Sequence, residues 1–245
     1  MLNQSYVHGA SAVPLIGETI GVNFDAAAAR WGDREALVVR HQDIRWSYTD
    51  LKHQIDALAA GLLAAGLAPG DRIGIWSPNN AEWVITQFAT AKAGLILVNI
   101  NPAYRVSELE YALKKTACKA LILATAFKTG DYVAMIREIA PEIDGCAPGE
   151  LESDRLPHLK ILIQITENPT AGMIAFNAIA GLAGDAERQR LSELQDTLQF
   201  DDPINIQFTS GTTGFPKGAT LTHFNILNNG FFVGEAMKLT EADRL

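Results

Sequence analysis

"RIGIWSPNNAEWVITQFATAKAGLILV", residues 72–98, contains the pattern that decides the fold. It opens with a short strand-like run and continues into a helical pattern whose inner face would hold Val84, Phe88 and Ala91. The all-apolar run 95–98 that follows is typical of a strand buried on both faces. Strand, helix and strand in this order predict a parallel βαβ unit.

The same alternation extends in both directions along the chain. Upstream, the runs 36–40 and 44–48 predict a hairpin, and Thr49 is the expected N-cap of the helix that follows. Downstream, Ser107 and Glu110 match a capping box at the start of another helix. Further apolar runs predict strands at 120–124, 160–165 and 204–208. We therefore predict an α/β fold of βαβ units, with mostly parallel sheets flanked by helices.

Composition narrows the class of protein. The 245 residues are 48% hydrophobic, which suits one large domain or two small ones. Lys and Arg total 20 against 28 for Asp and Glu, and a net charge of −8 argues against nucleic acid or an anionic membrane as partner. The two cysteines provide no disulfide framework, and no apolar run is long enough to span a bilayer. The N-terminus lacks a signal-peptide pattern, so we expect a cytoplasmic protein.

One segment interrupts the alternation of strands and helices. In addition, several polar residues are better explained by turns, helix starts or burial than by a catalytic role. The segment 141–158 is rich in Pro, Gly and acidic residues and is predicted to be a surface excursion. The triplet 129–131 predicts a turn and a helix start, the pair 201–202 a solvated turn, and His223 a helix-start residue. Cys118 is expected to be a buried, inert thiol.

The stretch "FTSGTTGFPKGAT", residues 208–220, is the candidate functional loop. It follows the predicted strand 204–208, and ligands of open α/β sheets bind beyond the carboxyl ends of strands. Its glycines allow backbone N–H groups to converge, Ser210 and Thr212 are among its hydroxyl donors, and Lys217 adds a positive charge. This combination suits a polyphosphate, and the alternative is a solvent-exposed connector.

Two common nucleotide-binding patterns do not fit this loop. The Walker pattern requires Gly-Lys followed by Ser or Thr, whereas Pro216 precedes Lys217 and Gly218 follows it. The dinucleotide pattern Gly-x-Gly-x-x-Gly does not occur in the sequence. A generic P-loop NTPase is therefore disfavoured.

The loop instead resembles the phosphate-loop signature of the adenylate-forming enzymes, which include acyl-CoA synthetases, luciferases and peptide-synthetase adenylation domains. The match runs through 209–214 and 216–218. The stretches 70–113 and 221–230 are similar to acyl-CoA synthetases, in particular to fatty-acid ligases of the medium-chain type. The resemblance covers roughly residues 25–245.

This resemblance implies a two-step reaction. A fatty carboxylate attacks the α-phosphate of ATP to give an acyl adenylate and pyrophosphate, and the thiol of CoA then displaces AMP. The loop would wrap the β- and γ-phosphates, Mg²⁺ would share their charge, and Lys217 would be the catalytic residue within this part of the chain. The resemblance assigns ATP binding to Thr209, Ser210, Gly211, Thr212, Thr213, Gly214 and Lys217.

The resemblance also places functional segments after the loop. The family's Mg²⁺-binding glutamate, its ribose-binding aspartate and a small C-terminal domain with a catalytic lysine would lie beyond Leu245. Residues 1–245 are thus expected to be the N-terminal portion of the family's large domain, inactive alone, and no metal ligand is assigned within them. Two alternatives remain open. One is a non-catalytic acyl- or nucleotide-binding module of the same fold, and the other is an adenylate-forming ligase for another carboxylic acid.

Overall fold

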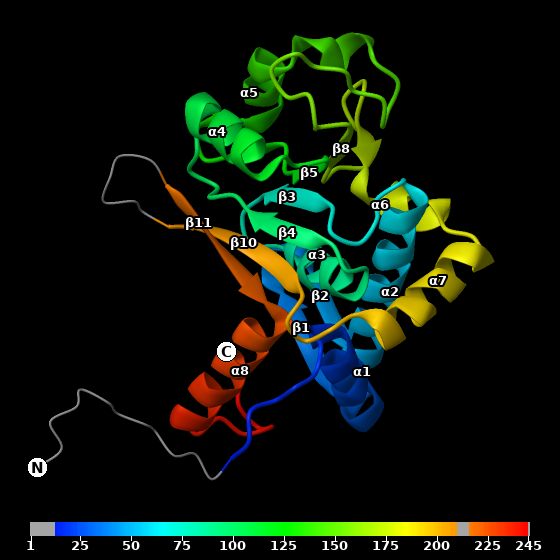
Figure 1. The fold of residues 1–245 in the computed structure, drawn as a ribbon, viewed down its shortest axis with the longest axis vertical. Helices are drawn as coiled ribbons and strands as arrows, with labels where there is room; N and C mark the ends of the chain where they lie inside the picture. The colour runs from blue at the N-terminus through cyan, green and yellow to red at the C-terminus, as the bar shows by residue number, and fades with distance from the viewer. Residues whose placement is uncertain (1–12, 210–215, 245) are drawn as a thin grey trace, which may run out of the picture.

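The computed structural model describes residues 13–209 and 216–244. Within them the centre is a seven-stranded sheet with the strand order β11, β10, β4, β3, β5, β8, β9 (Figure 1). The pairs from β10 to β9 are parallel, and β11 alone runs antiparallel to its neighbour β10. The predicted α/β fold with a mostly parallel sheet is confirmed. Strands β1 and β2 form the predicted hairpin, which is a two-stranded sheet of its own.

The described strands alternate with helices for most of the chain. The strands are β1 Glu35–Val39, β2 Ile44–Ser47, β3 Arg72–Trp76, β4 Ile96–Asn99, β5 Ala120–Leu123, β6 Ala126–Phe127, β7 Gly130–Asp131, β8 Ile161–Gln164, β9 Ile174–Ala175, β10 Pro203–Thr209 and β11 Lys217–Thr222. The α-helices are α1 Ile20–Trp31, α2 Tyr48–Ala64, α3 Ala81–Lys92, α4 Val106–Thr116, α5 Tyr132–Ile139, α6 Phe176–Ile179, α7 Asp185–Thr197 and α8 His223–Ala236.

Helices cover both faces of the sheet. Side chains of a strand alternate between its faces, so Ile73 and Ile75 of β3 pack with α1, α2, α3 and α7, whereas Trp76 packs with α4 and α5. Figure 1 shows α4 and α5 on one side of the sheet and α1, α2 and α7 on the other. On the α4–α5 side the rings of Trp76 and Tyr132 stack with centroids 3.5 Å apart. Two apolar cores therefore hold the sheet in a fixed position.

The inner face of α3 differs slightly from the prediction. Ala91 is buried as expected, but Val84 and Phe88 are only half-buried. Their neighbours Ile85 and Ala89 are buried instead, at 4% and 0% exposure. Two of the three expected positions are thus displaced by one residue, because Val84 and Phe88 each have an apolar neighbour that could be turned inward instead.

The start of α2 also differs from the prediction. Ser47, rather than Thr49, is the N-cap. The Ser47 Oγ accepts from the Asp50 N–H at 3.1 Å, and the Asp50 carboxylate accepts from the Ser47 N–H at 3.0 Å. This reciprocal pair satisfies two N–H groups at the helix end and fixes its start. The prediction was wrong because the preceding strand ends earlier than its β-type residues indicate.

The start of α4 is a second correction. Arg105 occupies the N-cap position, and its backbone N–H donates to the Glu108 carboxylate at 2.8 Å. The predicted capping box of Ser107 and Glu110 is wrong, because both residues already lie inside the helix. Glu110 instead pairs with Arg155, and the two cationic groups around it hold the pKa of its carboxyl down at about 2.

The prediction of a surface excursion at 141–158 is wrong, because several residues of this segment are buried. Ile143, Leu151 and Leu156 are at most 2% exposed and belong to the core that also contains α4 and α5. Their spacing among Pro, Gly and acidic residues follows neither helical nor strand periodicity, so the sequence pattern does not reveal their burial. The segment covers part of this core instead of leaving it.

Candidate functional site

Strand β10 carries the candidate loop to the carboxyl edge of the sheet. It runs parallel to β4, with Gln207 beside Asn99, and β4 runs parallel to β3, with Asn99 beside Ile75. Thr209, at the end of β10, therefore lies just past the point where β4 ends. The prediction that the loop leaves the carboxyl end of a parallel strand is confirmed.

The chain returns from the loop along a strand that the sequence did not reveal. Strand β11 pairs antiparallel with β10, and Lys217 lies directly opposite Thr209. Strands β10 and β11 therefore form a β-hairpin whose described ends are Thr209 and Lys217 (Figure 1). Helix α8 begins only at the far end of β11, at His223, so its N-terminus does not face the loop.

The two faces of this hairpin have different surroundings. Phe208 lies opposite Gly218 and packs against the core that contains α4 and α5. Thr209 and Lys217 occupy the next register position, so their side chains project from the opposite face of the hairpin. Both residues are exposed, and the Thr209 hydroxyl lies 3.4 Å from the Lys217 carbonyl oxygen. Within residues 13–209 and 216–244, Lys217 forms no ion pair.

The structure brings together the two ends of the predicted site. Thr209 and Lys217 form one cross-strand pair and offer a hydroxyl and an ammonium group on one face. This donor set suits the oxygen atoms of a phosphate. The other predicted ATP-binding residues lie outside the described residues: Ser210, Gly211, Thr212, Thr213 and Gly214.

A tyrosine that sequence reasoning missed holds the base of this hairpin. The hydroxyl of Tyr111 in α4 donates to the carbonyl oxygen of Pro216 at 3.2 Å. Its ring also lies against Phe208, with centroids 6.3 Å apart and the planes inclined at 60°. Tyr111 and Pro216 are 105 positions apart, so no local pattern could have indicated this contact.

Two further polar atoms lie buried at the carboxyl edge. Trp76 Nε1, at the end of β3, and Asn99 Oδ1, at the end of β4, have no hydrogen-bond partner among the described residues. An unpaired buried donor or acceptor costs free energy, and such atoms cluster where a ligand or water completes the site. The described residues contain no group of three or more His, Cys, Asp or Glu side chains placed to bind a metal ion.

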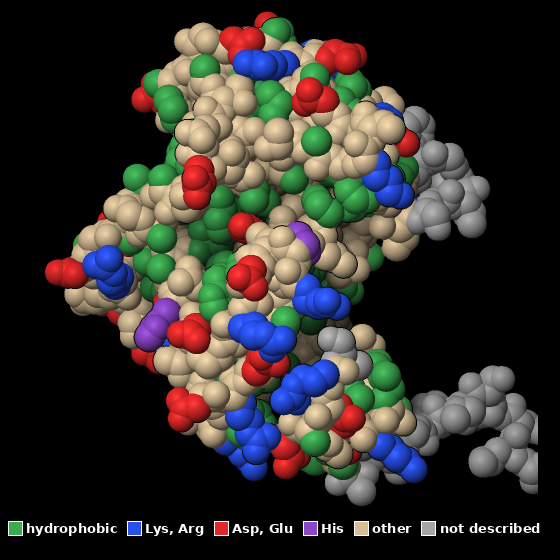
Figure 2. Space-filling model, turned by 180° about the vertical axis from the view of Figure 1, so that it is seen from behind, with side chains coloured by type: hydrophobic (Ala, Val, Ile, Leu, Met, Phe, Trp, Pro, Cys, Tyr) green, Lys and Arg blue, Asp and Glu red, His purple; other side chains and the backbone are tan. Residues whose placement is uncertain are grey.

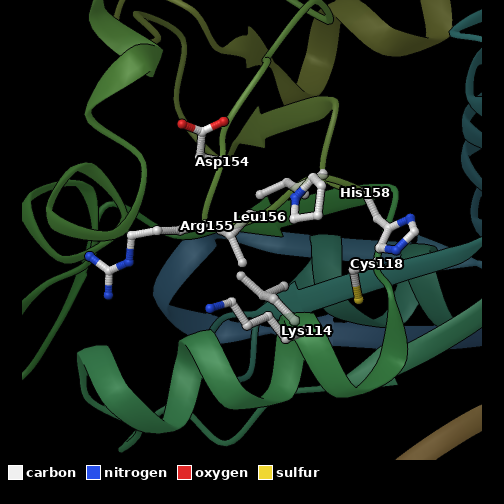
Figure 3. A pocket seen from close by; sticks show the side chains of 9 residues that line it. Lys114, Cys118, Asp154, Arg155, Leu156 and His158 are labelled. Atoms are coloured by element: carbon white, nitrogen blue, oxygen red, sulfur yellow. The ribbon is translucent and has the colours of Figure 1, made fainter.

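A separate cavity of about 310 Å³ lies away from this hairpin (Figure 3). It is bounded by Lys114 and Cys118 at the end of α4 and by the segment from Asp154 to Leu159. Cys118 lies two residues before the start of β5, so the cavity lies at the amino edge of the sheet, opposite the carboxyl edge that β10 reaches at Thr209. Both of its neighbouring cations, Lys114 and Arg155, pair with Glu110, which leaves them little capacity for an anionic ligand.

The polar residues for which the sequence predicted a structural role have that role in the structure. Asp131 caps α5, its carboxylate accepting from the Ala134 N–H at 3.0 Å, and His223 begins α8. Asp202 accepts from the Gln199 N–H at 2.8 Å in the turn before β10. Cys118 is 1% exposed, and burial raises the pKa of its thiol to about 11, so it is inert.

The surface shows acidic and basic side chains interspersed on the face seen in Figure 2, without a continuous basic stripe there. Within the described part of the chain, no helix combines the length and apolar character needed to cross a bilayer.

The chain belongs to the AMP-binding enzyme family, whose profile matches residues 24–245. It is 48% identical over 240 residues to the medium-chain acyl-CoA ligase ACSF2 of Homo sapiens, covering 97% of this chain and 38% of that protein. The putative acyl-CoA synthetase YngI of Bacillus subtilis is 39% identical over 94% of this chain and 42% of its own length. These similarities confirm the predicted family.

Solved structures agree with the fold. A putative long-chain-fatty-acid CoA ligase from Rhodopseudomonas palustris matches with a TM-score of 0.71 and 25% identity, over 93% of this chain and 50% of that one. The anthranilate CoA ligase AuaEII, in complex with anthranoyl-AMP, shares the fold with a TM-score of 0.68 and 22% identity, over 86% and 36% of the two chains. The chain thus spans at most half the length of these relatives.

The comparisons also correct one expectation. The ACSF2 relatives of Homo sapiens and Bos taurus, 48% and 47% identical to this chain, are named as mitochondrial proteins. This finding contradicts the expected cytoplasmic location. The inference from the N-terminal sequence was wrong because the missing signal-peptide pattern concerns secretion and does not address other compartments.

Proposed function

We propose that a protein carrying this chain activates a fatty acid with ATP and transfers the acyl group to CoA. The observation that carries this proposal is the hairpin end at the carboxyl edge of the sheet, where Thr209 and Lys217 face each other. Identity of 45–49% to medium-chain acyl-CoA ligases supports the choice of reaction. On this proposal, residues 1–245 are the N-terminal portion of the large domain of an adenylate-forming enzyme.

Lys217 has the central chemical role in this proposal. Its ammonium group meets phosphate oxygens, with no ion pair to break among the described residues, and neutralises charge that grows as the α-phosphorus is attacked. The Thr209 hydroxyl on the same face donates to a neighbouring oxygen. Ser210, Gly211, Thr212, Thr213 and Gly214 complete the ATP-binding loop in this proposal. Mg²⁺, when bound together with ATP, would share the negative charge of the phosphates.

The fatty acid is favoured over other carboxylic acids by sequence identity, not by the fold. AuaEII, which shares the fold, is named as a ligase of anthranilate, an aromatic acid. Identity to it is 22%, whereas identity to the medium-chain ligase of Homo sapiens is 48%. We therefore propose a medium-chain fatty acid as the substrate class, with ATP and CoA as co-substrates.

The substitution Lys217→Ala in the complete protein tests this proposal. Loss of one preorganised donor to transition-state charge typically costs about 3 kcal/mol, or on the order of 10²-fold in rate. We expect kcat/KM for ATP to fall by about that factor in octanoate-dependent pyrophosphate exchange, with kcat falling too. Lys217→Arg should restore activity only in part, because a planar guanidinium differs in shape from an ammonium group.

A matched control uses another exposed lysine. Lys115 lies in α4 and is exposed, and Lys115→Ala should leave the exchange kinetics unchanged. Wild-type kinetics from Lys217→Ala would refute a phosphate role for the hairpin. Faster exchange with benzoate than with octanoate would leave adenylation intact but contradict the proposed substrate class.

A further inference from the structure

We propose that Tyr111 positions the hairpin end that carries Thr209 and Lys217 for ATP, without contacting ATP itself. The inference rests on the proposed function, because it assigns the base of the same hairpin a role in nucleotide binding. Tyr111 is the point at which α4 contacts this base through both a hydrogen bond to Pro216 and a ring contact with Phe208.

The contact joins both strands of the hairpin at the level of the proposed phosphate donors. Phe208 precedes Thr209 at the end of β10, and Pro216 precedes Lys217 at the start of β11. Tyr111 touches the residue before each member of the Thr209–Lys217 pair. A displacement of its side chain would therefore shift the entry and the exit of the loop together.

The element that carries Tyr111 is fixed in the core. Its neighbours Leu109 and Leu113 in α4 are 0% and 2% exposed and pack between α4 and the sheet. Glu110 ties the outer side of the same turn to Arg155. The tyrosine hydroxyl thus offers the Pro216 carbonyl a partner whose position is set by the core of the protein.

Tyr111 lies on the opposite side of the hairpin from the proposed phosphate donors. Phe208, which it touches, faces α4, whereas the side chains of Thr209 and Lys217 project from the other face. Removal of the Tyr111 hydroxyl consequently deletes no donor to phosphate. It removes the hydrogen bond to the Pro216 carbonyl oxygen that holds the hairpin end, which separates positioning from direct binding.

The substitution Tyr111→Phe in the complete protein tests the inference. A hydrogen bond between uncharged groups contributes modestly, and a bond of 3.2 Å is longer than the usual 2.7–2.8 Å for hydroxyl donors, so we expect KM for ATP to rise about fivefold. KM for octanoate in the same pyrophosphate exchange should stay unchanged. The variant removes one oxygen from a half-buried ring, so it should fold.

Tyr132→Phe is the matched control. The Tyr132 hydroxyl also donates to a proline carbonyl, that of Pro102, at 2.6 Å, but it holds the segment after β4 and not the hairpin. This variant should lose thermal stability at least as much as Tyr111→Phe and should retain the wild-type KM for ATP. Hydrogen–deuterium exchange of the β10–β11 amides, measured without substrates, should be faster in Tyr111→Phe and unchanged in Tyr132→Phe.

The outcomes separate this inference from the proposed function. An unchanged KM for ATP in Tyr111→Phe, or an equal rise in both variants, would overturn the positioning role, as would unchanged amide exchange in β10 and β11. If Lys217→Ala is impaired while Tyr111→Phe matches the wild type, the proposed function stands and the positioning role fails. If Lys217→Ala has wild-type kinetics, the proposed function fails first and the inference fails with it.

Discussion

His223 should make the folded state less stable as the pH falls below about 6.5. Its side chain is 0% exposed, and its Nδ1 accepts a hydrogen bond from the Ile20 N–H at 3.2 Å. The neutral ring therefore carries its proton on Nε2, which has no partner among the described residues. A second proton would make Nδ1 a donor facing another donor. Burial lowers the pKa of His223 to about 4, against a weaker opposing effect of the Asp202 charge.

The magnitude follows from the two pKa values. The unfolded chain binds the proton near pH 6.5 and the folded chain near pH 4, so the unfolded state binds more protons between them. The contribution of neutral His223 to stability is complete above pH 6.5 and is lost as the pH falls through 4. A shift of one pKa unit corresponds to about 1.4 kcal/mol. The free energy of unfolding should therefore fall by about 3 kcal/mol in total, of which about 2 kcal/mol is lost between pH 7.5 and 5.

Urea unfolding at pH 7.5 and pH 5 measures this effect. The variant His223→Asn keeps an oxygen acceptor for the Ile20 N–H and removes the titrating ring. On acidification, the free energy of unfolding should fall by about 2 kcal/mol more in the wild type than in this variant. The effects of other titrating groups occur in both proteins and cancel in the comparison. His158→Asn, at an exposed histidine, should behave as the wild type does. Equal losses in wild type and His223→Asn would refute the reasoning.

Two further predictions concern packing and completeness. A Cβ at Gly61 in α2 would lie 2.2 Å from the Ile179 carbonyl oxygen, so Gly61→Ala should lower the free energy of unfolding by about 3 kcal/mol in urea titrations. Gly181→Ala, where a Cβ meets nothing within 4 Å, should change it by less than about 1 kcal/mol, and equal effects would contradict the steric reason. Residues 1–245 alone should stay at background in a coupled assay with ATP, CoA and octanoate, and clear turnover would show that the later segments of the family are dispensable.

The strands of the parallel sheet could be predicted because their signal is local. The run 72–76 is β3 to the residue, and the run 120–124 contains β5. A strand buried on both faces needs apolar side chains at consecutive positions, and that requirement is visible in the sequence itself. The helices between them were placed correctly, but their starts and inner faces shifted by one or two residues, since several polar residues could serve as caps.

Strand β11 could not be predicted from the sequence, because its own residues do not favour a strand. Lys217–Thr222 holds a glycine and two threonines, and its first four residues are exposed. The segment is extended because β10 offers an edge with unpaired backbone groups. The burial of Lys92 depends on tertiary context in the same way. Its side chain is only 3% exposed, and it can be buried because it pairs with Asp25 of α1 and Asp56 of α2.

The donor groups of the candidate site can be read from the sequence, but their geometry could not be predicted from it. The glycines, hydroxyls and lysine of 208–220 indicate an anion, and the structure places the Thr209–Lys217 pair at the expected edge. The Tyr111 contact joins segments 105 positions apart and becomes visible only once α4 is packed beside β10. Function here depends on both kinds of information, because a donor binds a phosphate only where the fold holds it.

The hairpin also changes the physical account of the proposed phosphate site. In a strand–loop–helix arrangement, the helix N-terminus supplies about half a positive charge to a bound phosphate. Here α8 begins at the far end of β11, too distant in the chain to serve the loop in that way. Lys217 is the one cation on the described residues of β10 and β11. On the proposed function, the hairpin's charge then depends on this side chain, so no neighbouring group of the hairpin can compensate for its loss.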